Sequence, residues 1–578
     1  MNQNINQVAQ DWVDQDPDID SKTDGQALID LNDEAMLLSH FGTSLSFGTA
    51  GLRGALGPGP NRMNSATVIR VTSALAAYTK STVQSDTGYI AIIGFDGRYG
   101  SKKFADYAAR VLLAEGYKIY LFDDVVPTPR LAHALLEVNA SIGIMVTASH
   151  NPPQDNGYKV YWGDGAQIIP PHDTEISKRV DLISDTSQVP LSDLNTARTQ
   201  GRLVDVSQDI QTRYYDAVSK LRVYDGPTNL NLVYSAMHGV GRKSVERVLR
   251  ENGYENINIV EAQADPDPDF PTVAFPNPEE PGAMDLSLQL ANEVNADVVF
   301  ANDPDADRLC VAIPVLGGYR LLTGNEIGVL LADELLRYGQ YSGETLVVTT
   351  IVSTSMLQKV AAEHGARCVE TLTGFKWLAH EGMKQQSRGG AFVVGFEEAI
   401  GYSVGPIVRD KDGVSAALIF ADLASRSMSQ GQSLENRLND LYRAHGLYET
   451  TQRSFKFPGQ SGQAIMAQMM DQLRSNPPME LDGCEVREIK DYLISETVSL
   501  ESGQQTNIDL PKSNVLGFHM RNGSRLMVRP SGTEPKIKFY FEICESVADG
   551  ESIDDVRQRA MEHLDRFVST TMAKLHLD

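Results

Sequence analysis

Hydrophobic residues recur along this chain in two alternating patterns. Short runs rich in Ile and Val, at 89–93 and 142–146, are typical of buried strands. The amphipathic stretch 104–114 ends before Gly116 and predicts a helix, and 117–122 predicts the next strand. Because strand, helix and strand follow one another, we expect a largely parallel sheet covered by helices.

The same alternation begins again twice further along the chain. A second unit is predicted from a strand at 232–234, a helix that ends at Glu251 and a strand at 257–260. A third unit is predicted from a strand at 346–349, a helix at about 354–363 and a strand at 367–370. We therefore expect three successive α/β units. No repeat of about 20–50 residues is visible, which argues against a solenoid.

The two ends of the chain differ from this middle part. The first forty residues are polar and acidic with helical periodicity, and predict an N-terminal helical extension. Segment 456–515 is rich in Gln, Ser, Asp and Pro. Strands at 524–528 and 536–543 and a final helix near 551–575 predict a smaller C-terminal α+β domain. The expected fold class is α/β, with three successive mixed-sheet domains at 1–205, 206–322 and 323–450 and the α+β domain at 451–578.

Charge and composition exclude several classes of protein. The 578 residues carry a formal net charge of −25, which argues against a nucleic-acid partner and against binding to anionic membranes. An anionic substrate would need a local basic pocket. The N-terminus is polar, and no apolar run approaches the roughly 18 residues of a membrane helix. With four widely spaced cysteines, which we interpret as buried thiols, these features predict a soluble cytoplasmic protein.

Ser149 lies directly after the predicted strand 142–146, within the sequence Thr-Ala-Ser-His-Asn-Pro. In open α/β sheets, ligands bind at the carboxyl ends of the strands. A serine at such a position can be a nucleophile, a phosphate carrier or an ordinary turn residue. Three further loops bear on the choice.

The first of these loops places three carboxylates, Asp303, Asp305 and Asp307, at alternating positions after a predicted strand at 297–300. Such a cluster repels itself unless a cation lies within it, and oxygen ligands suit Mg²⁺ or Ca²⁺. A solvated acidic turn is the alternative. The adjacent Arg308 favours a metal site with a phosphate beside it, because guanidinium binds phosphate in a bidentate manner.

Two other loops offer groups for a sugar phosphate. Glu397 follows a predicted strand at 391–394, and its carboxylate could bind sugar hydroxyls or do acid–base work, although an exposed acidic turn is the alternative. The loop 529–536 supplies the donors that a phosphate monoester needs, with a plain hairpin turn as the alternative. It lacks the Walker pattern. These donors are Arg529, Ser531, Gly532, Thr533 and Lys536.

Isolated cations and hydroxyls add less specific indications. Lys159 could assist proton removal or balance phosphate charge, and a solvated lysine is the alternative. Thr373, Gly374 and Lys376 offer a further hydroxyl and cation, and a core aromatic flanked by a surface lysine is the alternative.

Taken in order, these loops resemble those of the α-D-phosphohexomutase superfamily, which includes phosphoglucomutases and phosphomannomutases. The likeness covers about residues 40–545, and 47–54 and 96–98 also fit it. The resemblance implies four domains around one central cleft, with Ser149 carrying the transferred phosphoryl group. The candidate catalytic residues are Ser149, His150, Lys159 and Arg308; the metal ligands Ser149, Asp303, Asp305 and Asp307; and the substrate-binding residues Arg53, Thr373, Gly374, Lys376, Glu397, Arg529, Ser531, Gly532, Thr533 and Lys536.

The resemblance also implies an activity. We expect reversible interconversion of hexose 1-phosphate and hexose 6-phosphate, of glucose or mannose, through a phosphoserine and a sugar bisphosphate. The expected cofactors are Mg²⁺ and glucose 1,6-bisphosphate, or a related sugar bisphosphate, as primer. The expected partner is the phosphosugar substrate, with the chain a monomer or dimer.

One position departs from the hexomutase pattern. Ala399 stands where many hexomutases have a serine, and the sequence Phe-Glu-Glu-Ala-Ile-Gly-Tyr around it looks more like a subgroup with phosphopentomutase and sugar-bisphosphate synthase activities. A phosphopentomutase or glucose 1,6-bisphosphate synthase is therefore the alternative enzyme. A phosphatase with the same residues and a non-catalytic phosphosugar-binding module are further alternatives.

Overall fold

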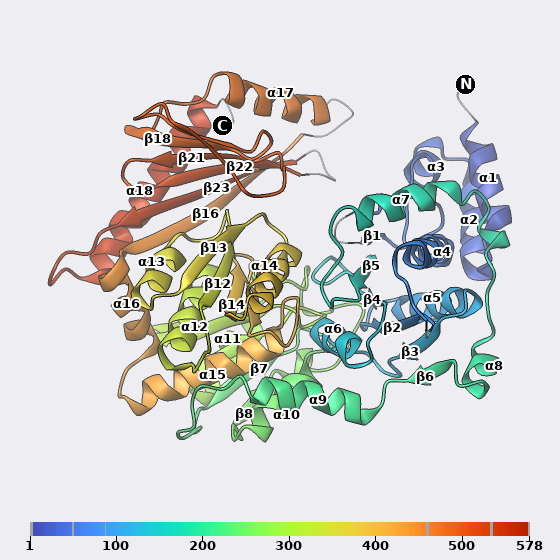
Figure 1. Cartoon of the computed structure of the whole chain (residues 1–578), viewed down its shortest axis with the longest axis horizontal. Coiled ribbons are helices and arrows are strands. Elements are labelled where there is room, and N and C mark those ends of the chain that lie inside the picture. Colours follow the sequence, from blue (N-terminus) through green and yellow to red (C-terminus); the bar gives the residue numbers. More distant parts are fainter. Residues whose placement is uncertain (1–3, 49–50, 87, 458–461, 532–535, 576–578) are drawn as a thin grey trace. The chain divides into compact units, whose positions relative to one another are not determined.

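The computed structural model describes residues 4–48, 51–86, 88–457, 462–531 and 536–575 (Figure 1). The chain forms two units. Unit 1 comprises Met1–Gly324 together with Ile400–Gln430, and unit 2 comprises Asn325–Ala399 together with Gly431–Asp578. Each unit is described by itself below.

Three short helices form the N-terminal extension of unit 1, as the sequence predicts. They are α1 (Ile5–Gln15), α2 (Ile19–Leu31) and α3 (Glu34–Phe41). The side chains of Asn4, Asp18 and Asp33 cap their N-termini, because each accepts a hydrogen bond from a backbone N–H of the first turn. Ala9 and Leu37 are buried between the helices.

The first sheet of unit 1 has the order β1-β5-β4-β2-β3-β6. Its strands β4, β2, β3 and β6 are parallel, whereas β5 and β1 are antiparallel to their neighbours. The strands are β1 (Leu52–Ala55), β2 (Ile90–Phe95), β3 (Lys118–Leu121), β4 (Ile142–Val146), β5 (Asp155–Trp162) and β6 (Leu203–Asp205). The helices are α4 (Ser65–Thr82), α5 (Ser101–Ala114), α6 (Thr128–Glu137), α7 (His172–Leu182) and α8 (Leu194–Thr199). The apolar faces of these elements enclose one core.

The second sheet of unit 1 has the order β11-β10-β9-β7-β8, with β9, β7 and β8 parallel. The strands are β7 (Leu232–Ser235), β8 (Ile257–Ile259), β9 (Val298–Ala301), β10 (Cys310–Val315) and β11 (Gly318–Leu321). The helices are α9 (Gln208–Ser219), α10 (Arg242–Glu251) and α11 (Asp285–Val294). Later in the chain, β15 (Gly401–Val404) and α15 (Gly413–Ser429) also belong to this unit, and α15 packs on α10.

Unit 2 begins with a parallel arrangement of three strands in the order β13-β12-β14. These are β12 (Thr345–Thr350), β13 (Arg367–Thr371) and β14 (Ala391–Glu397). The helices are α12 (Gly324–Tyr338), α13 (Met356–Glu363), α14 (Phe375–Ser387) and α16 (Leu434–His445). Leu346, Val348 and Phe392 pack against Phe375 and Leu378 of α14 in a small core.

The C-terminal part of unit 2 is an antiparallel sheet with helices. Its order is β16-β23-β22-β21-β18-β19-β20, with β17 beside β18, and α18 packs on β16 and β23 (Figure 1). The strands are β16 (Leu447–Lys456), β17 (Glu480–Leu481), β18 (Cys484–Asp491), β19 (Glu496–Ser499), β20 (Gln505–Asn507), β21 (Leu516–Met520), β22 (Arg525–Pro530) and β23 (Lys536–Glu545). The helices are α17 (Gly462–Ser475) and α18 (Ile553–Lys574).

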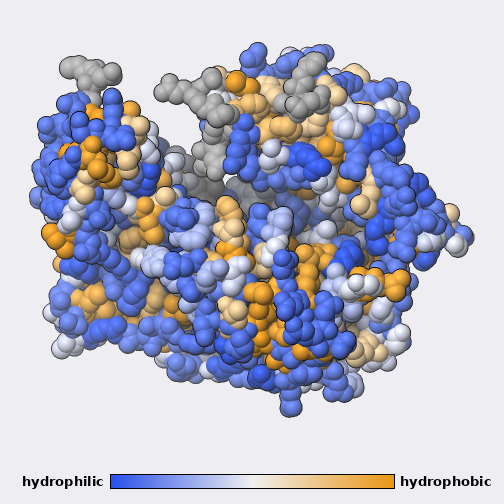
Figure 2. Space-filling view, turned by 180° about the vertical axis from the view of Figure 1, so that it is seen from behind, coloured by the Kyte–Doolittle hydropathy of each residue, from blue (hydrophilic) through white to orange (hydrophobic). Residues whose placement is uncertain are grey.

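This architecture confirms the predicted fold class of mixed α/β sheets followed by a C-terminal α+β part. Hydrophilic residues cover most of the face shown in Figure 2, with hydrophobic residues in smaller groups between them. Within the described ranges, no helix is long and apolar enough to cross a membrane. Two positions that the sequence places in loops lie on strands instead, because Arg53 belongs to β1 and Glu397 is the last residue of β14.

Candidate active site

Ser149 lies in the loop that follows β4, as the sequence predicts. The side chain is buried, and the backbone has a φ of 54°. This left-handed conformation is uncommon for a residue with a Cβ, so the surrounding structure must hold it in place. The backbone N–H of Ser149 donates to the Thr147 hydroxyl at 2.8 Å, which fixes the turn from the strand side.

The Arg98 guanidinium also holds this loop. It donates to the backbone carbonyls of Ser149 at 2.6 Å and of Pro152 at 2.8 Å, and to those of Asn151 and Asp155. Its own position is set by Asp96, which lies 3.4 Å from Arg98 Nε. Four carbonyls held by one rigid, planar group explain how the loop keeps its strained conformation.

Three aspartates face Ser149 from the loop after β9. Asp303, Asp305 and Asp307 are fully buried, and one carboxylate oxygen from each lies within 4.8 Å of the others. The hydroxyl of Ser149 donates to Asp303 Oδ2 at 2.7 Å. The structure therefore brings together the serine and the three carboxylates that sequence reasoning placed in one site.

Three cations surround the carboxylates. Lys159 Nζ, on β5, lies 2.7 Å from Asp305 Oδ2 and 3.0 Å from Asp307 Oδ2. Lys411 Nζ lies 3.1 Å from Asp307 Oδ2, and Arg308 Nε lies 4.0 Å from Asp303 Oδ2. Three cations thus lie beside three carboxylates, so this part of an acidic chain carries more positive charge than the chain as a whole.

The surroundings shift the pKa values of the three carboxyl groups in different directions. Burial, together with the charges of Asp307 and Asp305, raises the pKa of Asp303 well above its ordinary value. Burial opposes ionisation of Asp305 and Asp307 as well, but neighbouring donors and cations, with Lys159 foremost, together lower the pKa of both. Lys411 acts in the same direction on Asp307. Asp303 therefore lacks sufficient compensating positive charge.

The cluster fits a divalent cation. The Oδ1 atoms of Asp305 and Asp307 are buried, and neither accepts a hydrogen bond from the described residues. A buried carboxylate oxygen without a donor is costly, and a cation bound among the three side chains would satisfy it. Oxygen ligands of this kind suit Mg²⁺. Asp303, Asp305 and Asp307 are the residues that could hold it, beside the Ser149 hydroxyl.

His150 and Arg53 also lie at this site. His150 Nδ1 is 3.2 Å from Ser149 Oγ. Burial and the charges of Arg308 and Arg53 lower the pKa of His150 well below its ordinary value, so the ring is neutral. A neutral imidazole beside the hydroxyl can accept or donate a hydrogen bond, depending on its tautomer.

Sequence reasoning missed two residues of this site. Thr128, the first residue of α6, donates from its hydroxyl to Asp305 Oδ2 at 2.6 Å and from its backbone N–H to the Asp305 carbonyl at 3.0 Å. Lys411 lies between two aspartates just before α15, and a charged stretch of this kind is typical of a solvated loop. The backbone at Gly413 packs closely against Arg308, because a Cβ on Gly413 would clash with the Arg308 carbonyl oxygen. This close packing places the nearby Lys411 at the site.

The predicted sugar-binding residues lie in unit 2. Glu397 Oε1 accepts a hydrogen bond from the backbone N–H of Gly374 at 2.8 Å, so β14 and the start of α14 meet at this point. Lys376 Nζ lies over the ring of Trp377, 5.3 Å from its centre. Glu397 therefore contacts the segment 373–376, which carries Thr373, Gly374 and Lys376.

Of the predicted phosphate-binding residues, Arg529 lies on β22, Ser531 follows that strand and Lys536 is the first residue of β23, all in unit 2. The backbone N–H of Ser531 donates to the Lys536 carbonyl at 2.7 Å, which closes the hairpin. Burial and the charges of Glu398 and Glu397 raise the pKa of Tyr540, and the charge of Arg529 on β22 opposes this shift. Gly532 and Thr533 lie outside the described residues.

Comparison with known families finds four successive matches. They are the phosphoglucomutase/phosphomannomutase alpha/beta/alpha domains I at 44–186, II at 212–316 and III at 323–445, and the C-terminal domain at 485–559. The chain is also similar to the solved structure of a putative phosphomannomutase from Thermus thermophilus. The TM-score is 0.66 at 21% identity, and the similarity covers 91% of this chain and 99% of the other.

Curated relatives are similar over nearly the whole length. A probable phosphoribomutase from Schizosaccharomyces pombe is 36% identical over 571 residues, 96% of each chain. A phosphoglucomutase from Staphylococcus aureus strain MRSA252 is 35% identical over 523 residues, 90% of this chain and 92% of the relative. With all four domains of the family present in order, the chain belongs to the phosphoglucomutase/phosphomannomutase family and is an intramolecular phosphotransferase.

Proposed function

We propose that the protein interconverts hexose 1-phosphate and hexose 6-phosphate, with Ser149 as the phosphoryl carrier. The observation that supports this most directly is the buried Ser149 hydroxyl, 2.7 Å from Asp303 within the triad of aspartates. Phosphorylated Ser149 donates its phosphoryl group to the hydroxyl of a sugar monophosphate. The P–O bond to serine breaks, a P–O bond to the sugar forms, and the hydroxyl proton leaves to a base. The bisphosphate then returns its other phosphoryl group to Ser149.

The surrounding side chains would stabilise the negative charge that develops during both phosphoryl transfers. Lys159, Lys411 and Arg308 supply positive charge beside the phosphoryl oxygens, which carry the developing negative charge. Mg²⁺ held by Asp303, Asp305 and Asp307 would offset further charge on those oxygens. The buried position of Ser149 would also keep water from hydrolysing the phosphoserine.

We assign substrate binding to the residues of unit 2. The carboxylate of Glu397 would accept hydrogen bonds from sugar hydroxyls. Arg529, Ser531 and Lys536, with Gly532 and Thr533, would bind the phosphate that is not being transferred. We also propose four domains at 1–205, 206–322, 323–450 and 451–578. Each of the four family matches falls within one of these ranges, which supports the boundaries.

Replacement of the carrier serine tests the central step. Ser149→Ala should lower kcat by several orders of magnitude without changing the melting temperature, because the phosphoryl group loses its acceptor. Ser141→Ala, just before the same strand, is the matched control and should remain active. Mass spectrometry should find one added phosphoryl group on Ser149 of the wild type. Near-normal turnover in Ser149→Ala would overturn the mechanism.

A pentose phosphate is the second candidate substrate. Ala399 offers no hydroxyl near Glu397, where many hexomutases have a serine. The relative from S. pombe, which is similar over 96% of each chain, is named a probable phosphoribomutase. With Mg²⁺ and a trace of glucose 1,6-bisphosphate as primer, kcat/KM should be compared on glucose 1-phosphate, mannose 1-phosphate and ribose 1-phosphate. A preference for ribose 1-phosphate would favour the pentomutase. Net bisphosphate formation would favour the synthase, and phosphate release without isomerisation would favour a phosphatase.

A further inference from the structure

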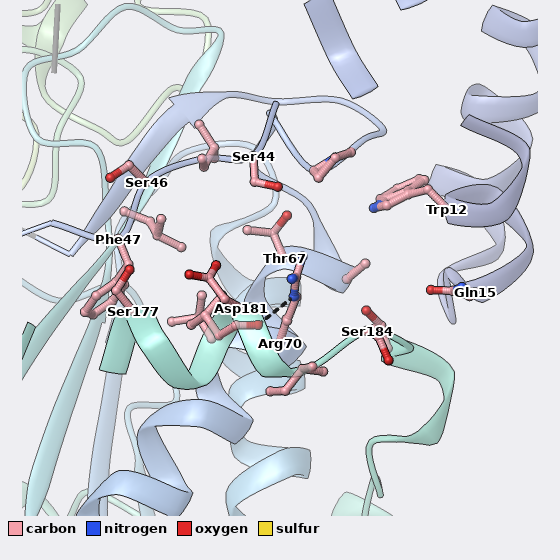
Figure 3. A pocket seen from close by; sticks show the side chains of 18 residues that line it. Trp12, Gln15, Ser44, Ser46, Phe47, Thr67, Arg70, Ser177, Asp181 and Ser184 are labelled. Carbon is pink, nitrogen blue, oxygen red and sulfur yellow. Dashed lines mark hydrogen bonds between the residues drawn. The ribbon is translucent and has the colours of Figure 1, made fainter. Parts of the chain in front are cut away.

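A cavity of about 280 Å³ lies in unit 1 between the N-terminal extension and the first sheet domain. Its walls come from α1, from the segment before β1, from α4 and from α7 (Figure 3). None of the candidate catalytic, metal-binding or substrate-binding residues lines it. The volume approaches the lower end of small-molecule sites, roughly 300 Å³.

Arg70 of α4 is the principal charged group inside the cavity. Its Nε donates to the backbone carbonyl of Val180 at 3.1 Å, which fixes the direction of the side chain (Figure 3). Its two terminal amino groups make no hydrogen bond to any residue that the structure describes. Burial lowers the pKa of Arg70, and Asp181 partly offsets this effect. The guanidinium therefore presents two amino groups, and each can donate a hydrogen bond to one oxygen of a carboxylate or phosphate group.

The remaining lining favours a ligand with hydroxyl groups and a ring. Trp12 and Gln15 enter from α1, while Ser177 and Asp181 enter from α7 (Figure 3). The Trp12 ring offers an apolar surface for the face of a sugar, and the amide, hydroxyl and carboxylate offer partners for sugar hydroxyls. Asp181 balances the charge of Arg70, so a ligand with one anionic group fits better than a polyphosphate.

We propose that this cavity is a second ligand site, which binds a small hydroxylated oxyanion through Arg70 and Trp12. A sugar monophosphate and a sugar acid share this chemistry, and the experiment below distinguishes them. The ligand bridges α1 to α4 and α7, so it also ties the N-terminal extension to the sheet domain.

The chain contains three tryptophans, Trp12, Trp162 and Trp377, which allows a site-resolved test. The full-length protein is labelled with 5-fluorotryptophan, and Trp12→Phe assigns the Trp12 resonance in the ¹⁹F NMR spectrum. The probes are glucose 6-phosphate, gluconate and neutral glucose. We expect a saturable shift of the Trp12 resonance with at least one of the two anions and none with glucose. A shift with glucose 6-phosphate alone identifies a sugar phosphate, and a shift with gluconate alone a sugar acid.

Variants of Arg70 connect the shift to the cavity. Arg70→Met should weaken the binding seen at Trp12 roughly tenfold or more, because it removes the charge and both donors. Arg179→Met is the matched control, since Arg179 is the neighbour of Val180 on α7 but does not line the cavity. Arg70→Lys keeps the charge without the planar fork and should bind with intermediate affinity, which covers the case in which Arg70→Met does not fold.

Three further results decide the outcome. Hydrogen exchange of the α1 amides should slow when the anion is bound, because the ligand contacts Trp12 and Gln15 on that helix. An unmoved Trp12 resonance with both anions at up to about 10 mM would overturn the second site. An equal shift in the Arg70→Met protein would do the same.

Discussion

Single side chains far from Ser149 in the sequence hold its loop in place. Arg98 binds four carbonyls of residues 149–155, and it can do so because its guanidinium has five donors in one plane. The guanidinium also lies over the ring of Phe270, 4.9 Å from its centre. A lysine could reach one or two of these carbonyls and would leave the others without a donor. Arg98 is therefore a positioning residue for Ser149.

Arg98→Lys should lower kcat by roughly a hundredfold and change KM little, because a misplaced nucleophile affects the transfer step more than substrate binding. Steady-state kinetics on glucose 1-phosphate would separate the two constants. Arg110→Lys on α5 is a suitable control, since Arg110 stacks on Tyr107 instead of holding the loop. A variant with normal kcat and raised KM would assign Arg98 to substrate binding instead.

Lys411 is the second residue whose role depends on the fold. Lys411→Met should lower kcat by about 10²-fold or more, since one charged donor beside the transferred group is removed. The exposed Lys243, which pairs with Asp124 at the surface, gives the control Lys243→Met. Unchanged turnover in Lys411→Met would show that its contact with Asp307 serves only the resting charge balance.

The chemistry of this site follows from the sequence where residues are adjacent in a loop. Ser149 and the three aspartates each follow a hydrophobic strand, and that local pattern is sufficient to propose them. Thr128 and Lys411 have no such pattern, because their partners Asp305 and Asp307 come from another segment of the chain. Their roles depend on packing that no local periodicity records.

At the scale of elements, hydrophobic periodicity places the strands well but sets their ends less well. The prediction ends the strand at residue 394, whereas β14 continues to Glu397, and its Phe396 pairs with Thr349 of β12. The glycine-rich segment around Arg53 gives no strand pattern, yet β1 forms because its partner β5 supplies the hydrogen bonds. Tertiary pairing thus determines the residues next to the chemistry.

Helix α6 carries a buried histidine that should affect stability as the pH falls. Burial lowers the pKa of His133 below its ordinary 6.5, and Arg213 acts in the same direction while Glu137 opposes it. The unfolded chain therefore binds a proton at a higher pH than the folded chain does. The contribution of neutral His133 is fully present above pH 6.5 and is lost as the pH falls from that value through the lower pKa of the folded protein.

The matching experiment measures the free energy of unfolding by urea between neutral and mildly acidic pH. His133→Phe keeps an aromatic ring beside Tyr214 and should make this pH dependence shallower, by about 1.4 kcal/mol for each unit of pKa difference that is removed. Parallel profiles for the wild type and the variant would mean that other groups cause the acid sensitivity.

At the scale of the whole chain, the order of the α/β units follows from the alternating pattern, but the grouping of distant segments does not. Segment 400–430 belongs to unit 1, where Asp422 accepts hydrogen bonds from Arg222 and from Tyr254. Its helix α15 is apolar on nearly all sides, which indicates burial without identifying the partner. Lys411 reaches Asp307 because it precedes this helix.

Net charge and the aspartate cluster should give separable effects on stability. A charge of −25 destabilises the folded chain through self-repulsion, so NaCl should raise the melting temperature by screening. MgCl₂ at the same ionic strength should raise it further, because a ligand that binds the folded state at about 100 times its Kd adds roughly 2.7 kcal/mol.

Asp305→Asn separates the two effects, because it removes a proposed metal ligand and changes the net charge by only one unit. Its melting temperature should rise with NaCl as in the wild type, while the additional gain with MgCl₂ should disappear. Asp265→Asn, at an exposed position with the same change of charge, should keep both effects. If MgCl₂ and NaCl stabilise the wild type equally at matched ionic strength, the buried cluster of Asp303, Asp305 and Asp307 does not bind the cation in the resting protein. Its like charges must then be balanced by the neighbouring cations Lys159, Lys411 and Arg308.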